Sequence, residues 1–253
     1  MSEYEELPTT VAVAWGLRDA ASRPRRRGLS LARIVEAGIR VATAEGLPAV
    51  SMNRVAAELG AAPMSLYRHL AAKDELLAHM VDSVYQLAPT PPDAGESWRD
   101  GLRRWAAGYL TILRRHPWVL RIPIGGPPLM PNQVLWLERG LQCLQNTRLA
   151  ADEKPSTLLL IDGFVRSQAT LEADLQVAAR TSGTPLEQVG TAYGRTLARL
   201  TDAARFPAIH ALLEARVFDG EAPLDHDFTF GLGRILDGID VLVRAREQGG
   251  AAT

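Results

Sequence analysis

Hydrophobic residues recur at intervals of three and four positions along most of the chain, and no useful stretch alternates hydrophobic with polar. This spacing is the period of an amphipathic helix, so the pattern predicts an all-α fold. Ser30 is placed to cap a first helix, and Gly46 is placed to end it. The apolar stripe of this helix consists of Leu31, Ile34, Val35, Val41 and Ala42.

Two further short helices follow, separated by a break at Gly60. Ser51 can begin the first of them, with Val55, Ala56 and Leu59 turned inward. After the break, "AAPMSLYRHL" resumes with Leu66 and Leu70 on one side, which is the spacing of a helix-turn-helix. A fourth helix is predicted from Lys73 to about Ala88.

The segment 89–97, "PTPPDAGES", is a poor helix and predicts a domain boundary. We therefore expect an N-terminal arm over 1–27, expected to be flexible, a three-helix DNA-binding domain with the helix-turn-helix over 28–88, and a larger helical ligand-binding and dimerisation domain over 89–253. Helices are expected in this last domain from Trp98 to before Pro117, over 134–144 and 155–180, from Pro185 and Pro207, and over 227–246. Thr184 and Glu187 form a capping-box pair around Pro185, which is predicted to be the first helical residue.

The last predicted helix has an apolar stripe that is wide for a chain terminus. Three glycines inside it, Gly231, Gly233 and Gly238, each cost about 1 kcal/mol relative to alanine, which makes sense where backbones approach closely. With the 155–180 helix it could form a four-helix bundle across a two-fold axis of a homodimer. The residues assigned to this dimer contact are Leu232, Ile235, Ile239 and Leu242; the alternative is a helix packed only on its own chain.

Composition places the chain among well-cored globular proteins, since 47% of its 253 residues are hydrophobic and 23% are charged. No apolar run approaches the roughly 20 residues that cross a bilayer, and the acidic start lacks the layout of a signal peptide. We therefore expect a cytoplasmic protein with no membrane partner. The one cysteine, Cys143, has no neighbours spaced like zinc ligands, and we expect neither a metal nor a cofactor.

The net charge of −1 is divided unevenly along the chain. Residues 18–73 hold ten basic and four acidic residues, a net charge of +6, so the remainder carries −7. A basic first third joined to an acidic body is typical of a phosphate-binding module attached to a domain that does not bind phosphate.

The helix-turn-helix spacing assigns DNA contacts to particular side chains. The first residues of the second helix meet base edges in the major groove, and flanking residues meet phosphates. Arg68 could bond guanine acceptors and Met64 could touch a thymine methyl. The residues at exposed early positions of the reading helix are Pro63, Met64, Ser65 and Arg68, and those assigned to phosphates are Ser51, Asn53, Tyr67, His69 and Lys73.

The alternative is that Tyr67 and His69 are half-buried packing residues and that Lys73 is a solvated helix start. Upstream, Arg25, Arg26 and Arg27 are secondary candidates, because an arginine arm can enter the minor groove. A solubilising tail is the other interpretation of these arginines.

Residues 28–85 resemble the DNA-binding domain of the TetR family of bacterial repressors. The resemblance lies in "AEGLPAVSMNRVAAELGAAPMSLYRHLAAKDELL", with Gly46, Gly60, the Leu66-Tyr67 pair, His69 and Lys73 in place. It extends to "VAWGLR" near the start, and "HPWVL", "IDGFVRSQA" and "FTFGLGRILDGIDVLV" resemble the tetracycline-repressor-type C-terminal domain. The resemblance implies a homodimer, a palindromic double-stranded DNA operator, and release when a small-molecule effector enters the C-terminal domain.

An aromatic-rich set in the second domain suits a largely apolar cavity for a molecule of drug or metabolite size. The alternative is that these aromatic stripes are ordinary core. The residues predicted to line the cavity are Trp105, Tyr109, His116, Trp118, Trp136, Phe164, Arg166 and Gln168.

Enzyme patterns are weak in this sequence. "DHD" at 225–227 is better explained by Asp225 or Asp227 capping the last helix, and "GLG" at 231–233 follows no strand. His210 has no evident serine or acid partner, so we expect no catalysis. The remaining alternative is a helical dimeric small-molecule-binding protein without operator binding.

Overall fold

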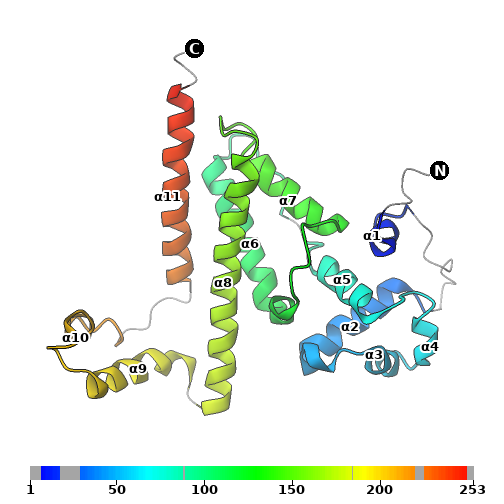
Figure 1. Ribbon diagram of the computed structural model, residues 1–253, viewed down its shortest axis with the longest axis horizontal. Coiled ribbons are helices and arrows are strands. Elements are labelled where there is room, and N and C mark those ends of the chain that lie inside the picture. The colour runs from blue at the N-terminus through cyan, green and yellow to red at the C-terminus, as the bar shows by residue number, and fades with distance from the viewer. Residues whose placement is uncertain (1–6, 18–28, 88, 184, 220–224, 250–253) are drawn as a thin grey trace.

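The computed structural model describes residues 7–17, 29–87, 89–183, 185–219 and 225–249 (Figure 1). Every regular element in these ranges is a helix, in agreement with the predicted all-α class. None of the described helices is both long enough and apolar enough to span a bilayer.

Four α-helices and one short 3₁₀ helix build the N-terminal unit: α2 (Leu31–Glu45), η1 (Leu47–Ala49), α3 (Met52–Glu58), α4 (Pro63–Leu66) and α5 (Lys73–Val84). Both predicted serine caps are confirmed: the side chain of Ser30 accepts a hydrogen bond from the backbone N–H of Arg33, and that of Ser51 from Arg54. Gly60 lies in the turn with φ +62°, a left-handed conformation that glycine adopts without strain. The buried side chains between these helices include Ile34, Val41, Val55, Leu66, Leu70, Leu76 and Met80.

Two boundaries differ from the sequence prediction. The reading helix α4 is regular for only four residues, because the chain tightens there: the N–H of His69 bonds to the carbonyl of Leu66, three residues back. Helix α5 ends at Val84 rather than near Ala88, and the Tyr85 carbonyl that follows it accepts the indole N–H of Trp136.

The second unit consists of α6 (Trp98–Arg115), the short η2 (Pro117–Arg121), α7 (Pro131–Cys143), α8 (Glu153–Ser182), α9 (Leu186–Leu200), α10 (Pro207–Glu214) and α11 (His226–Gly249). The central helix α8 packs against α6, α7 and α11 through Leu158, Ile161, Val165 and Ala169. Figure 1 shows α8 and α11 running side by side, with α9 and α10 projecting away from the body.

Two sequence predictions need correction. Thr9–Ala14 form a helix, α1, inside the arm that was expected to be flexible. Pro185 precedes α9 rather than beginning it, since its ψ of 140° is not helical, and Thr184 lies outside the described residues. Pro207 does begin α10, as predicted.

The stripe on α11 faces its own chain. Leu232 and Ile239 are only 3% and 6% exposed within a single chain, and Ile235 and Leu242 pack partly against the same core. Of Gly231, Gly233 and Gly238, only Gly231 lies close to another element: a Cβ there would lie 2.6 Å from the Phe164 ring. A single copy of the chain therefore already covers much of the surface that the sequence analysis assigned to a partner.

Candidate DNA-reading surface and effector site

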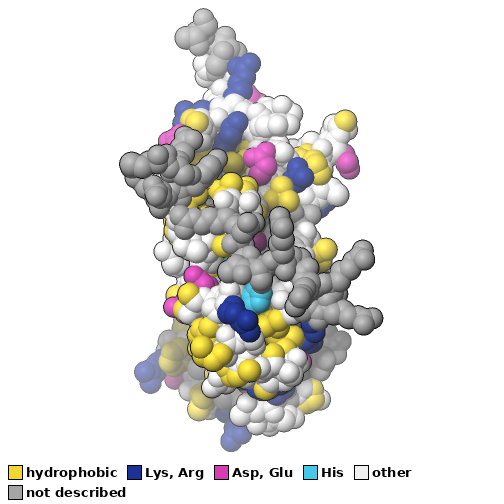
Figure 2. Space-filling model, turned by 90° about the vertical axis from the view of Figure 1, so that its right-hand side faces the viewer, with side chains coloured by type: hydrophobic (Ala, Val, Ile, Leu, Met, Phe, Trp, Pro, Cys, Tyr) yellow, Lys and Arg dark blue, Asp and Glu magenta, His cyan; other side chains and the backbone are white. Residues whose placement is uncertain are grey.

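The predicted DNA-reading side chains lie on a short stretch of surface at α3, α4 and the start of α5. Met64 is 73% exposed and Tyr67 is 47% exposed, although both are large and partly apolar. Arg68 and Lys73 are also exposed. Figure 2 views the molecule from this side and shows Lys or Arg side chains and a histidine beside exposed hydrophobic groups.

Some basic side chains of this unit form ion pairs with carboxylates and others do not. Arg54 is held by Glu45 and Glu58, with its Nη2 2.5 Å from Glu45 Oε1, and Arg40 is held by Glu58 at 3.2 Å. No ion pair of Arg68 or Lys73 occurs within the described part of the chain. Their charges therefore remain available for phosphate or base acceptors.

Other predicted contacts have local structural roles as well. Ser51 caps α3, and the hydroxyl of Ser65 donates to the Ala62 carbonyl. His69 is half-buried, and burial, aided by the charge of Arg68, lowers its pKa below the ordinary value. Asn53 is exposed and Pro63 begins α4, whereas Arg25, Arg26 and Arg27 lie outside the described residues.

Three of the predicted effector-site aromatics form one buried cluster with Tyr85. The rings of Trp105, Tyr109 and Trp136 lie about 6 Å apart in pairs: 6.1, 6.0 and 6.0 Å between centroids. The indole of Trp105 donates to the Trp136 carbonyl at 2.9 Å, and burial raises the pKa of the Tyr85 phenol. This cluster is the core of the joint between the two units.

Of the other predicted effector residues, Arg166 touches this cluster and the rest lie elsewhere. Arg166 donates to the Tyr109 hydroxyl at 3.2 Å, and Gln168 bonds to Glu172. Phe164 stacks on Phe228, with the ring centroids 5.9 Å apart.

His116 and Trp118 form an edge contact at the end of α6. The His116 Nδ1 and the Trp118 Nε1 are buried without a hydrogen-bond partner among the described residues. Such atoms usually find a partner, so a bound molecule could satisfy them.

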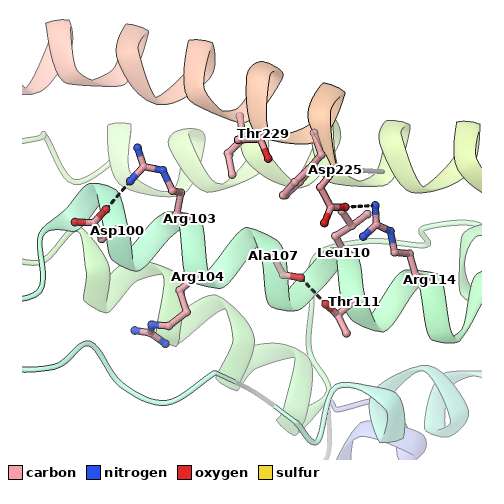
Figure 3. A pocket seen from close by; sticks show the side chains of 11 residues that line it. Asp100, Arg103, Arg104, Ala107, Leu110, Thr111, Arg114, Asp225 and Thr229 are labelled. Atoms are coloured by element: carbon pink, nitrogen blue, oxygen red, sulfur yellow. Dashed lines mark hydrogen bonds and ion pairs between the residues drawn. The ribbon is translucent and has the colours of Figure 1, made fainter. Parts of the chain in front are cut away.

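A hollow of about 470 Å³ lies between α6 and α11 (Figure 3). Its apolar lining includes Ala107, Leu110, Phe228 and Leu232, and its rim carries Arg103 and Arg114. In the close-up these two arginines point toward α11, whereas Arg104 points to the other side of α6. None of the eight predicted effector residues is among the described residues that line the hollow, although Phe164 stacks on the lining residue Phe228.

Arg114 is oriented by two carboxylates. Its guanidinium pairs with Glu172 of α8 at 2.7 Å and with Asp225 at 2.7 Å, and these hydrogen bonds raise its pKa. A guanidinium fixed in this way presents directed donors to carboxylate or carbonyl oxygens. Arg103 and Arg114 are not among the effector residues predicted from the sequence, although both lie in a polar stripe on α6 opposite its aromatic stripe.

The same helix connects the hollow to the DNA-reading unit. One face of α6 lines the hollow, and the opposite face contributes Trp105 and Tyr109 to the joint. There the Tyr109 hydroxyl lies 3.4 Å from that of Tyr85, which directly follows α5. A shift of α6 would therefore reach α5 through packed rings.

The groups considered for catalysis have structural partners. The His210 Nε2 lies 3.2 Å from the Thr201 hydroxyl and 3.1 Å from its carbonyl, and Asp225 is the partner of Arg114. No group of three or more potential metal ligands occurs in the part of the chain that the structure describes.

Comparisons with known proteins agree with this geometry. Residues 34–80 match the family model for bacterial regulatory proteins of the tetR family, and residues 90–243 match the tetracyclin repressor-like C-terminal domain. The chain is 36% identical to the HTH-type transcriptional repressor DrrR1 of Streptomyces coeruleorubidus over 242 residues, which cover 95% of this chain and 88% of that protein.

Two solved structures of ActR from Streptomyces coelicolor are also similar to this chain. The complex with actinorhodin has a TM-score of 0.72 and 27% identity, and covers 86% of this chain and 98% of that one. The complex with (S)-DNPA has a TM-score of 0.70 and 25% identity, and covers 84% and 98%.

Proposed function

Because the chain belongs to the TetR family of bacterial regulatory proteins, we propose that it is a cytoplasmic, homodimeric repressor that leaves a palindromic operator when an effector fills the α6–α11 hollow. The reading surface carries the DNA-binding part of this proposal. Met64, Tyr67 and Arg68 are exposed at the reading helix, and Lys73 is exposed at the start of α5. This arrangement suits base contacts from the helix and phosphate contacts from its flank.

The dimer uses the outer faces of α8 and α11 rather than the stripe assigned from sequence. Leu159 and Leu160 on α8 are 72% and 54% exposed, and Phe230 and Val241 on α11 are 62% and 70% exposed. Gly238 lies on the same side of α11 and has open space where its side chain would be. Burying these faces against a second copy removes apolar surface from water.

The effector has an apolar body and acidic or carbonyl oxygens. The apolar lining suits the body, and the oxygens can accept those N–H groups of Arg103 and Arg114 that the ion pairs with Asp100, Glu172 and Asp225 do not use. ActR, bound to actinorhodin in its crystal structure, is the relative that supplies a first probe.

The mechanism is a population shift. Two reading helices enter successive major grooves only when they stand about one DNA turn, roughly 34–36 Å, apart. In one conformation of the protein, α6 has moved against Trp136 and Tyr85, and this movement displaces α5 and changes the spacing of the reading helices. An effector that binds this conformation better increases its population. The effector's preference for this conformation sets the extent of release.

The operator test is protection of DNA fragments from the neighbouring chromosome by the purified protein, which we expect to show two half-sites. Arg68→Ala should then relax preference at one defined base position, at a cost of about 1–3 kcal/mol on the preferred operator. Arg40→Ala, which removes a charge that Glu58 already neutralises, is the matched control. Equal loss on every operator variant would contradict the reading role of Arg68.

The effector test adds actinorhodin to the protein–operator complex. We expect release, and Arg114→Ala should raise the concentration needed while leaving operator affinity without actinorhodin unchanged. Arg121→Ala, at an exposed arginine of η2, is the control. A midpoint for Arg114→Ala equal to that of the parent would contradict the hollow as the effector site, and no release from the parent would exclude actinorhodin as an effector.

A further inference from the structure

The short helix α1 lies against the DNA-reading unit. Ala12 is completely buried, and α1 packs on α5. The Thr10 hydroxyl donates to the Glu75 Oε1 on the first turn of α5 at 3.1 Å. One end of α1 is therefore fixed to the reading unit by both packing and a hydrogen bond.

Glu75 extends this contact to the reading helix itself. Its other oxygen, Oε2, accepts the backbone N–H of Ala71 at 2.6 Å, in the turn between α4 and α5. The Glu75 carboxylate thus connects α1 to the turn between α4 and α5, which determines the orientation of the reading helix α4.

The other end of α1 is fixed to the second unit. The indole of Trp15 donates to the Leu129 carbonyl at 2.7 Å, 114 residues further along the chain. Leu129 lies two residues before α7, and the Asp82 carboxylate of α5 accepts the first N–H groups of that helix, from Asn132 at 2.9 Å and Gln133 at 3.1 Å. Trp15 therefore ties α1 to the chain beside the joint.

Building on the proposed operator binding, we propose that α1 is an intramolecular strap that holds the reading unit at the operator-binding angle to the effector domain, with Thr10 and Trp15 as its positioning residues. The strap and the α5–α7 contact restrain the same angle from two different points. Losing the strap lets the reading unit populate other angles, and affinity for the operator falls with the fraction of molecules in the competent pose.

The experiment compares Trp15→Phe with the parent by hydrogen–deuterium exchange and operator affinity. Phenylalanine keeps an aromatic ring but cannot donate to Leu129. We expect faster exchange at the start of α7 as well as at the start of α5, and operator affinity about two- to tenfold weaker, the range for one lost hydrogen bond. Trp98→Phe, which removes an indole N–H from the first residue of α6, is the control.

Thr10→Val and the double variant distinguish a strap from separate local contacts. Once Trp15→Phe has disconnected the second unit, adding Thr10→Val should change operator affinity little further. The strap would be overturned if the losses of operator affinity in Trp15→Phe and Thr10→Val multiplied in the double variant, or if faster exchange were confined to α5. If the parent protein binds no operator, the proposed function fails, while exchange at the start of α7 still decides whether the strap holds the two units together.

Discussion

At the scale of single residues, the state of each charged group depends on its neighbours. Arg54 and Lys73 are both basic residues of the reading unit, but only Arg54 is held by carboxylates in the described structure. Histidines of this chain differ in burial instead: His79 is buried in α5, whereas His226 is exposed at the start of α11.

Lys73→Ala should weaken binding to all DNA sequences. An exposed ammonium at the start of α5 suits one phosphate, and each phosphate contact contributes about 0.9 to the slope of log affinity against log salt concentration. Titrations at several salt concentrations measure this slope, with Lys154 of α8, whose ammonium donates to the Gln145 carbonyl, changed to alanine as a control. An unchanged slope would remove Lys73 from the phosphate contacts.

His79 predicts a dependence of stability on pH. Burial lowers the pKa of His79, although the nearby Glu75 opposes this shift. The unfolded chain therefore takes up a proton near pH 6.5 that the folded protein does not, and stability falls as the pH drops from about 6.5 towards the lower folded pKa. Urea denaturation of His79→Gln should show a shallower fall than the parent over this range; His226→Gln is the control, and a slope unchanged in His79→Gln would contradict this role.

At the scale of elements, the joint between the two units depends on a cap that one helix provides for another: a side chain of α5 accepts the first backbone N–H groups of α7. Helix α7 begins at Pro131 without a side-chain cap from its own N-cap residue. The Asp82 carboxylate takes that place from α5, with the Asn132 side chain adding a third hydrogen bond at 2.8 Å. Burial raises the pKa of Asp82, and the hydrogen bonds from α7 oppose this effect.

Asp82→Ala should therefore lower the free energy of unfolding by about 1–3 kcal/mol, because it leaves partly buried N–H donors without an acceptor. Urea denaturation measures the loss, and Asp74→Ala, at an exposed position in the first turn of α5, is the control. A loss no greater than that of the control would show that the cap contributes little to the joint.

At the scale of the whole molecule, many of the large exposed apolar side chains lie on α8, α9, α10 and α11. α10 has no buried residue in a single chain, and Figure 1 shows α9 and α10 extending from the body. This distribution of exposed apolar surface is expected of one half of a dimer.

Val241→Glu should weaken this dimer, because it places a charge on the exposed face of α11 while leaving the chain's own core intact. Sedimentation should show monomers at concentrations where the parent is dimeric, with an unchanged helical circular dichroism spectrum. Arg244→Glu, at an exposed position on a neighbouring part of α11, controls for added negative charge. A Val241→Glu protein that stays dimeric would place the interface elsewhere.

The sequence by itself determined the helical class, the break at Gly60 and most helix boundaries, because spacing and capping are local properties. It also indicated which side chains of the helix-turn-helix are exposed, among them Met64, Tyr67, Arg68 and Lys73, because their order along two short helices fixes which way they face. The tertiary structure decided which side of α11 is free, that α1 spans the two units, and that the hollow is rimmed by Arg103 and Arg114 rather than lined by the predicted aromatics. These features depend on packing between residues far apart in the chain, and a helical period gives only the direction of a stripe, not the element that covers it.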